Sequence, residues 1–137
     1  MKSLLAGMLI MLALSTTALC EDQGEKAATA SANQWLSQVD RGDYSGSWES
    51  AAPVFKNAVS KDQWAKMLQA KRAPLGNVLS RNLKSAVYTT ALPGAPDGQY
   101  VVIVYESSFE HKKSAIETVT PSLGKDGQWR ASGYFIR

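Results

Sequence analysis

The stretch VLSRNLKSAVYTTALPGAPDGQYVVIVYESSF, residues 78–109, decides the fold class of this chain. From Val78 onward the hydrophobic period becomes two, which predicts β-strands over residues 79–92 and 99–109. Residues 93–98, Pro-Gly-Ala-Pro-Asp-Gly, combine proline and glycine and therefore predict a loop between the strands. Because short connections favour antiparallel neighbours, this stretch predicts an antiparallel pair.

Two more β-rich stretches follow, at residues 113–121 and 128–136. Glu110-His111-Lys112 is a polar hairpin tip, and Gly124–Gly127 contains the Asp-Gly hairpin signal. The C-terminal half of the chain is therefore predicted to form a curved, four-stranded antiparallel sheet.

The residues before the sheet have helical periodicity. One apolar face recurs every three or four residues and consists of Ala28, Ala32, Trp35, Leu36 and Val39. A second helix is expected to carry Tyr44, Trp48, Ala51 and Ala52 on one side; Pro53 interrupts it, and a continuation through Phe55 and Val59 stays open. Ser60 and Gln63 have the spacing of a capping box, so they predict the start of a third helix, which Pro74 and Gly76 end. Residues 34–137 are thus predicted to form one α+β domain, in which N-terminal helices pack against the sheet.

The first 20 residues predict export. Lys2 precedes an uncharged apolar run, Leu4–Leu14, which is too short to span a bilayer and fits a signal peptide. Small residues at Ala18 and Cys20 predict cleavage after residue 20. We therefore expect a signal peptide at 1–20, a polar lead into the first helix at 21–33, and a periplasmic or secreted domain without a transmembrane span.

Cys20, the single cysteine, has a second interpretation. It could be the lipid-modified first residue of an envelope lipoprotein, although that signal usually has Gly, Ala or Ser where Leu19 stands. Simple secretion is favoured, and the lipid anchor is the alternative.

Composition and charge exclude several classes. Hydrophobic residues make up 45% and charged residues 20% of the chain, as in globular proteins, and the net charge is +3. Lys56, Lys61, Lys66 and Lys71 recur every five residues, so on a helix they spiral around the axis and form no single stripe. We expect no nucleic-acid binding.

The pattern resembles the bacterial exported family known as domain of unknown function 4019. The residues that carry the resemblance are Trp35-Leu36-x-x-Val39-Asp40-x-Gly42-x-Tyr44, Ser47-Trp48-x-x-Ala51-Ala52, Arg72-x-Pro74-Leu75-Gly76, Leu92-Pro93-Gly94-x-Pro96-Asp97-Gly98-x-Tyr100 and Gly127-x-Trp129-Arg130-x-x-Gly133-Tyr134. The resemblance covers about residues 34–136 and implies no established activity. The order of helices and strands is similar to the nuclear transport factor 2-like, or cystatin-like, cone, a fold that hosts enzymes, ligand binders and dimerisation modules alike.

No catalytic or metal motif stands out. His111 is the only histidine, lies at the hairpin tip and is expected to be a solvated loop residue. Without a histidine or cysteine partner, neither a zinc site nor a hydrolase triad is supported, and no cofactor is expected.

The four tryptophans have two interpretations, core packing or the lining of an aromatic pocket for an unknown small molecule. The pocket candidates are Trp35, Tyr44, Trp48, Trp64, Arg72, Arg81, Tyr105, Glu117 and Tyr134. Two functions follow: a non-enzymatic module that binds a ligand or an envelope protein, which is favoured, and an enzyme that uses Glu117 with Tyr105 or Tyr134 for acid–base chemistry. A carboxylate in an open pocket, free of arginine, favours the enzyme.

Glu117 gives the sharpest expectation. By two-residue alternation it shares a strand face with Ala115 and Val119, and we expect that face to point inward. Since a buried charge needs a partner, Glu117 is predicted to form an interior ion pair with Arg81 or Arg72. Arg81 is expected to face inward with Leu83 and Val87.

Overall fold

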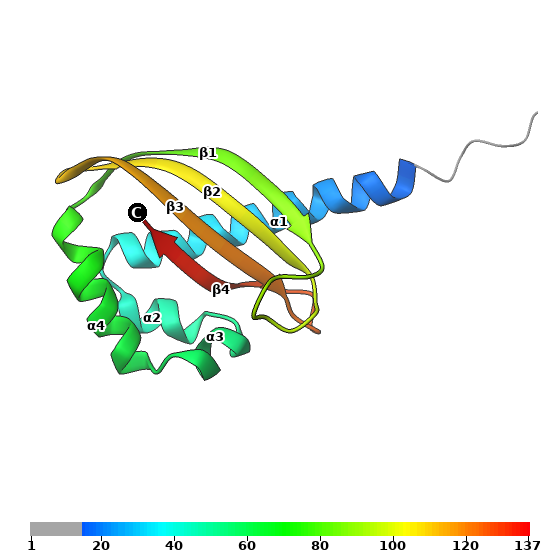
Figure 1. Ribbon diagram of the computed structural model, residues 1–137, viewed down its shortest axis with the longest axis horizontal. Helices are drawn as coiled ribbons and strands as arrows, with labels where there is room; N and C mark the ends of the chain where they lie inside the picture. The colour runs from blue at the N-terminus through cyan, green and yellow to red at the C-terminus, as the bar shows by residue number, and fades with distance from the viewer. Residues whose placement is uncertain (1–14) are drawn as a thin grey trace, which may run out of the picture.

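The computed structural model describes residues 15–137 and places helices before strands, as the sequence predicts (Figure 1). In chain order the elements are α1 (Ser15–Asp40), α2 (Tyr44–Glu49), α3 (Pro53–Ala58), α4 (Lys61–Lys71), the 3-10 turn η1 (Ala73–Leu75), β1 (Val78–Thr89), β2 (Tyr100–Phe109), β3 (Lys112–Leu123) and β4 (Trp129–Ile136). The sheet curves over α1, and α2 to α4 lie beside the β4 end of the sheet. The predicted α+β class is confirmed.

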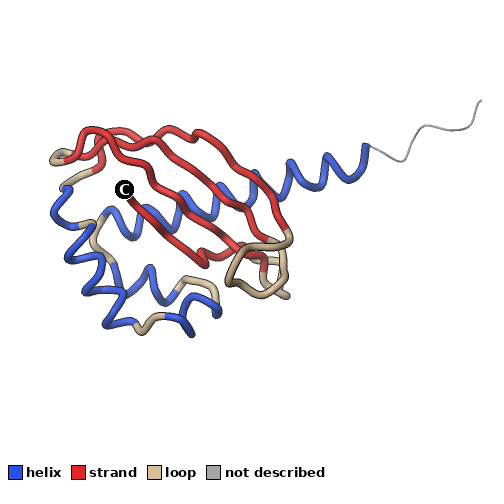
Figure 2. The backbone as a smooth tube through the Cα atoms, viewed as in Figure 1, coloured by secondary structure: helices blue, strands red, loops and turns tan. Residues whose placement is uncertain are grey.

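The sheet is a simple antiparallel meander in the order β1-β2-β3-β4. It stays open, and the helices gather on its concave side (Figure 2). The Asp-Gly signal before β4 is confirmed, because Gly127 has φ of 79°, a conformation that glycine adopts without steric cost. In the order β1-β2-β3-β4, the strands β1 and β4 are the two edges of the sheet.

The core lies between α1 and the two central strands. On β2 the odd-numbered residues are buried, whereas the even-numbered residues from 102 to 108 face outward and are half-buried or exposed. α1 supplies the opposite wall through Ala28, Ala32, Leu36 and Val39, all of which are buried. Burial of each large aliphatic side chain in this layer stabilises the fold by about 1.5–3 kcal/mol.

The helices differ from the predicted ones in two respects. α1 extends to Ser15, so the polar lead expected at 21–33 is helical throughout; its alanines are strong helix formers. The second predicted helix is shorter than expected: α2 ends at Glu49, so Ala51 and Ala52 lie outside it. The predicted interruption at Pro53 is confirmed, because Pro53 keeps the preceding Ala52 extended, with φ of −64° and ψ of 151°, and thereby separates α3 from α2. The capping box of α4 is confirmed by reciprocal hydrogen bonds of 3.2 Å between Ser60 and Gln63.

The predicted signal peptide falls mostly outside the described residues, since only its last six positions belong to α1. Within the described residues, none of the helices combines the length and the apolar character that a bilayer-spanning helix requires.

Candidate functional site

The most unusual side chain in the interior is the carboxylate of Glu117 in β3. It is fully buried, and its neighbours two positions away, Ala115 and Val119, are buried as well. The expectation that this strand face points inward is therefore confirmed.

Four hydrogen bonds surround the Glu117 carboxylate. Oε1 accepts from Arg81 Nε at 2.8 Å and from Ser107 Oγ at 2.6 Å. Oε2 accepts from Arg81 Nη2 at 3.2 Å and from Tyr134 Oη at 2.5 Å. Both oxygens thus use their lone pairs on donors from β1, β2 and β4.

A second carboxylate completes the cluster at the C-terminal end of α1. Asp40 accepts from Arg81 Nη1 at 2.8 Å and Nη2 at 2.9 Å, and from Arg72 Nη2 at 3.2 Å. Arg72 also donates to the Gly76 carbonyl at 2.7 Å, and its guanidinium stacks over Phe109 at 4.5 Å. Two arginines and two carboxylates therefore form one neutral polar cluster: Asp40, Arg72, Arg81 and Glu117.

The ionisation of the cluster follows from this arrangement. Burial would lower the pKa of Arg81, but its hydrogen bonds to Asp40 and Glu117 outweigh burial, so the net shift is upward and the guanidinium stays charged. Burial, followed by the negative charge of Glu117, raises the pKa of Tyr134 well above its ordinary value. Tyr134 therefore stays a phenol that donates to Glu117.

The predicted interior ion pair is confirmed for Arg81 and not for Arg72, which binds Asp40 instead. The expectation was wrong for Val87, which is 56% exposed. Leu83 lies on the same side of the sheet as Arg81, since the two pair with the buried Tyr105 and Ser107, but its side chain is 52% exposed. A register shift between Leu83 and Ser85 breaks the two-residue alternation there, so Val87 faces away from the core.

The other predicted pocket residues are either buried in the core or only partly buried. Trp35 and Trp64 are buried, and their indoles donate to the Ser47 carbonyl at 2.8 Å and to Ser47 Oγ at 2.9 Å. Tyr105 is buried beside Arg81 and donates to Asn33 at 2.6 Å. Tyr44 and Trp48 on α2 are only partly buried and pack against the hydrophobic core.

Sequence reasoning missed one member of the cluster, Asp40. It bridges both arginines, yet it lies 32 residues before Arg72 and 41 before Arg81. Its place directly before the turn at Gly42 suggested only the end of a helix.

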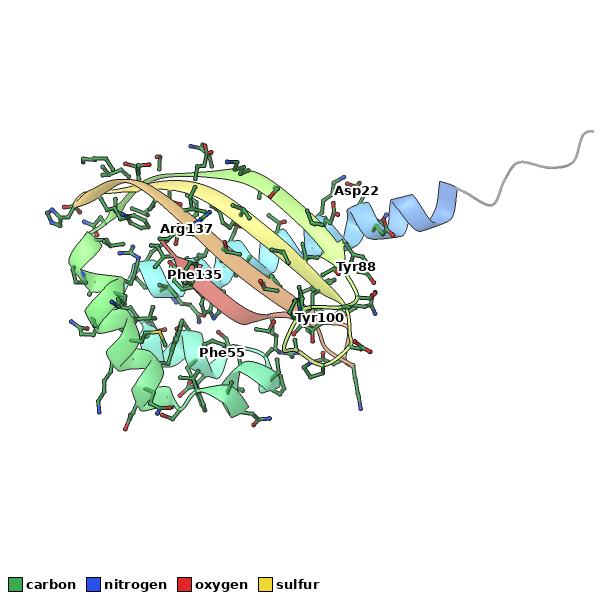
Figure 3. All side chains as sticks on the ribbon, in the orientation of Figure 1. Asp22, Phe55, Tyr88, Tyr100, Phe135 and Arg137 are labelled. Carbon is green, nitrogen blue, oxygen red and sulfur yellow. The ribbon has the colours of Figure 1, made fainter. Side chains whose placement is uncertain are left out.

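An open groove of about 410 Å³ lies between α4 and the C-terminal end of β4. We call it the α4–β4 groove; it is lined by Trp64, Met67, Leu68, Leu75, Tyr134, Phe135 and Ile136, with Lys71, Lys112 and Arg137 at its margins. Met67 and Phe135 are exposed, at 46% and 63%. Figure 3 shows Phe135 and Arg137 at the end of β4. Tyr134 connects the groove with the polar cluster, because it lines the groove and its hydroxyl donates to Glu117.

Two other hollows are more polar. One, of about 440 Å³, lies between α1 and the start of β4 and includes Trp35 and Trp129; another, of about 720 Å³, lies between α3 and the β1–β2 loop. In the part of the chain that the structure describes, no three side chains of His, Cys, Asp or Glu gather closely enough to hold a metal ion.

These features define a class: a small α+β domain with an open antiparallel meander, a neutral interior polar cluster and an apolar surface groove. A family model described as Protein of unknown function (DUF4019) matches residues 31–134. The chain belongs to this family, as the resemblance implies.

The fold also occurs in a solved structure of a protein from Catenulispora acidiphila. The two are 12% identical over 90% of this chain and 93% of the other, with a TM-score of 0.50. This similarity concerns the fold alone. No curated protein matches the sequence. The likeness to the nuclear transport factor 2-like cone stays a prediction.

Proposed function

We propose that this protein is an exported, non-enzymatic binding module whose ligand site is the α4–β4 groove. The observation that carries the proposal is the groove itself, in which Met67 and Phe135 present apolar surface to solvent. Exposed apolar surface gathered in a concave site is typical of binding sites.

The alternative, acid–base catalysis by Glu117, has little support. A general base needs a free lone pair that can reach a substrate. Glu117 is fully buried, paired with Arg81 and saturated by four hydrogen bonds. Its geometry favours a structural clasp that joins β1, β2, β3 and β4.

Export is part of the proposal, and the course of α1 is compatible with it. Among the residues from 21 onward, the first buried position of α1 is Ala28. Cleavage after Cys20 would therefore leave in place the buried residues of α1 from Ala28 onward. Intact mass of the protein from its own host tests this: we expect loss of residues 1–20, and a diacylglycerol adduct on Cys20 would select the lipoprotein alternative. Retention of Met1 would contradict export.

Binding in the groove is tested with 8-anilinonaphthalene-1-sulfonate, an anionic apolar dye. We expect saturable fluorescence enhancement with the folded wild type and at least a tenfold weaker response for Met67→Glu, which places a charge in the groove. The matched control is Leu79→Glu, since Leu79 is similarly exposed, at 55%, but lies on β1 and does not line the groove. Equal responses from both variants would reject the groove as the site.

A further inference from the structure

The outer edge of β4 carries main-chain groups that point away from the sheet. Arg137 and Ile116 exchange both main-chain hydrogen bonds, at 3.1 and 2.9 Å, so they are a hydrogen-bonded pair of the β3–β4 ladder. In an antiparallel ladder such residues alternate with residues whose N–H and C=O point to the other side. Tyr134 and Ile136 therefore direct theirs toward the outer edge.

The first half of this edge is already covered. The Ala131 carbonyl accepts from the Ala52 amide at 2.8 Å, and the Trp129 carbonyl accepts from Ser31 Oγ at 2.7 Å. Beyond Ala131, none of the described residues hydrogen-bonds the outward main-chain groups of Tyr134 or Ile136. A short open edge thus remains on both sides of Phe135.

The open edge and the α4–β4 groove coincide, because Tyr134 and Ile136 also line the groove. A strand added to an edge lies about 4.8 Å from its neighbour and turns every second side chain to the same face. A segment paired with Tyr134 and Ile136 would therefore direct alternate side chains toward Met67 and Leu75, and the others toward the outer face beside Phe135.

The charge of the groove selects the kind of segment. Lys71, Lys112 and Arg137 line it, and no Asp or Glu side chain does. None of the three cations forms an ion pair with an acidic side chain among residues 15–137. A second copy of this chain would bring the same three cations to the contact, whereas an acidic segment would neutralise them.

We infer that β4 accepts an extended peptide segment of a partner protein, in which apolar residues alternate with acidic ones, as a fifth strand of the sheet. The inference rests on the proposed function and names the class of its ligand. Main-chain hydrogen bonds to Tyr134 and Ile136 supply affinity, while the apolar groove and its cations supply specificity.

The test uses a capped peptide of alternating glutamate and valine, seven residues long, titrated into the full protein. We expect saturable binding together with slowed amide exchange at Tyr134 and Ile136. A lysine–valine peptide of equal length should bind at least tenfold more weakly. The glutamate–valine peptide N-methylated at every residue should lose binding, since neither of its edges keeps an N–H that could complete the ladder.

A matched pair of variants tests the edge from the protein side. Ile136→Pro removes an outward N–H but leaves the inward bonds of Arg137, whereas Ile136→Val keeps the N–H. We expect at least tenfold weaker peptide binding for Ile136→Pro only. If circular dichroism shows that Ile136→Pro is unfolded, the N-methylated peptide still tests strand addition, because it is measured with the wild-type protein.

Other outcomes would overturn the inference. Equal binding of the N-methylated peptide would exclude strand addition. Laurate, an apolar carboxylate, serves as a non-peptide ligand beside the dye. If the dye and laurate bind but the peptide does not, a peptide partner is rejected, while the groove remains the proposed ligand site. Concentration-dependent dimers with Tyr134 and Ile136 protected would make a second copy the occupant. Failure of dye, laurate and peptide alike would reject the proposed function as well.

Discussion

The polar cluster and the α4–β4 groove are neighbours that both contact Tyr134, yet their charged groups are neutralised to different extents. In the cluster, two guanidinium groups and two carboxylates neutralise one another inside the protein. In the groove, exposed apolar side chains and cations lack partners among the described residues. The cluster, whose charges are paired with one another, holds the fold together, whereas the groove presents unpaired groups to a ligand.

The largest expected effect tests the cluster. Glu117→Gln should lower the free energy of unfolding by about 3–5 kcal/mol, because it leaves the two guanidinium groups of the interior cluster with one carboxylate, Asp40, between them. Urea denaturation measures the loss. Glu106→Gln on β2 is the control: its pair with Lys84 is exposed, at 58% for each side chain, so we expect less than about 0.5 kcal/mol. Similar losses of unfolding free energy in the two variants would contradict a larger structural contribution from the interior cluster than from the exposed pair.

Trp64 belongs to both regions, since it is 2% exposed and also lines the groove. Trp64→Ala should cost about 3–5 kcal/mol of stability and should also weaken dye binding. Trp48→Ala, at a half-buried ring whose indole donates to the Val59 carbonyl at 2.8 Å, should cost less and leave the dye unaffected. If Trp48→Ala lost more stability than Trp64→Ala, the assignment of Trp64 to the core would be wrong.

Tyr134→Phe removes one donor from Glu117 and should cost about 1.5–3 kcal/mol at neutral pH. The raised pKa of Tyr134 also makes the free energy of unfolding depend on pH in alkaline solution. The stabilisation by Tyr134 is complete below the unfolded pKa of 10. It declines as the pH rises further, because the phenol loses its proton in the unfolded chain before it does so in the folded protein. Between pH 9 and 11 the wild type should therefore lose more stability than Tyr134→Phe. Parallel urea midpoints across this range would contradict the assigned hydrogen bond.

The smallest effect on stability is expected in the groove. Phe135→Ser should change the free energy of unfolding by less than about 0.5 kcal/mol, because the side chain is 63% exposed. Dye affinity should nevertheless fall several-fold. Loss of stability without loss of binding would reverse the roles assigned to the two regions.

Alternation along the chain was enough to predict the strands and the inward face of Glu117. Hydrophobic burial enforces that period on β2 and β3, which lie in the middle of the sheet and against α1. On the edge strand β1 the constraint is weaker, and the irregularity near Lys84 turned Val87 outward without any signal in the local sequence.

The site itself was only partly predictable. The ion pair between Arg81 and Glu117 followed from the cost of burying a lone charge. The role of Asp40 depends on where α1 ends relative to β1, and the open edge of β4 depends on strand order and on the contact between Ala52 and Ala131. Both are properties of tertiary structure that residue spacing does not encode.

The spacing of the four charged residues along the chain has a consequence for folding kinetics. Positions 40, 72, 81 and 117 meet only when the end of α1, the end of α4, β1 and β3 have all assembled. A partly folded chain that buried one or three of them would carry an unpaired charge, so such intermediates are penalised. The complete cluster therefore cannot form until β3 has been synthesised, and the domain is expected to fold in one cooperative step.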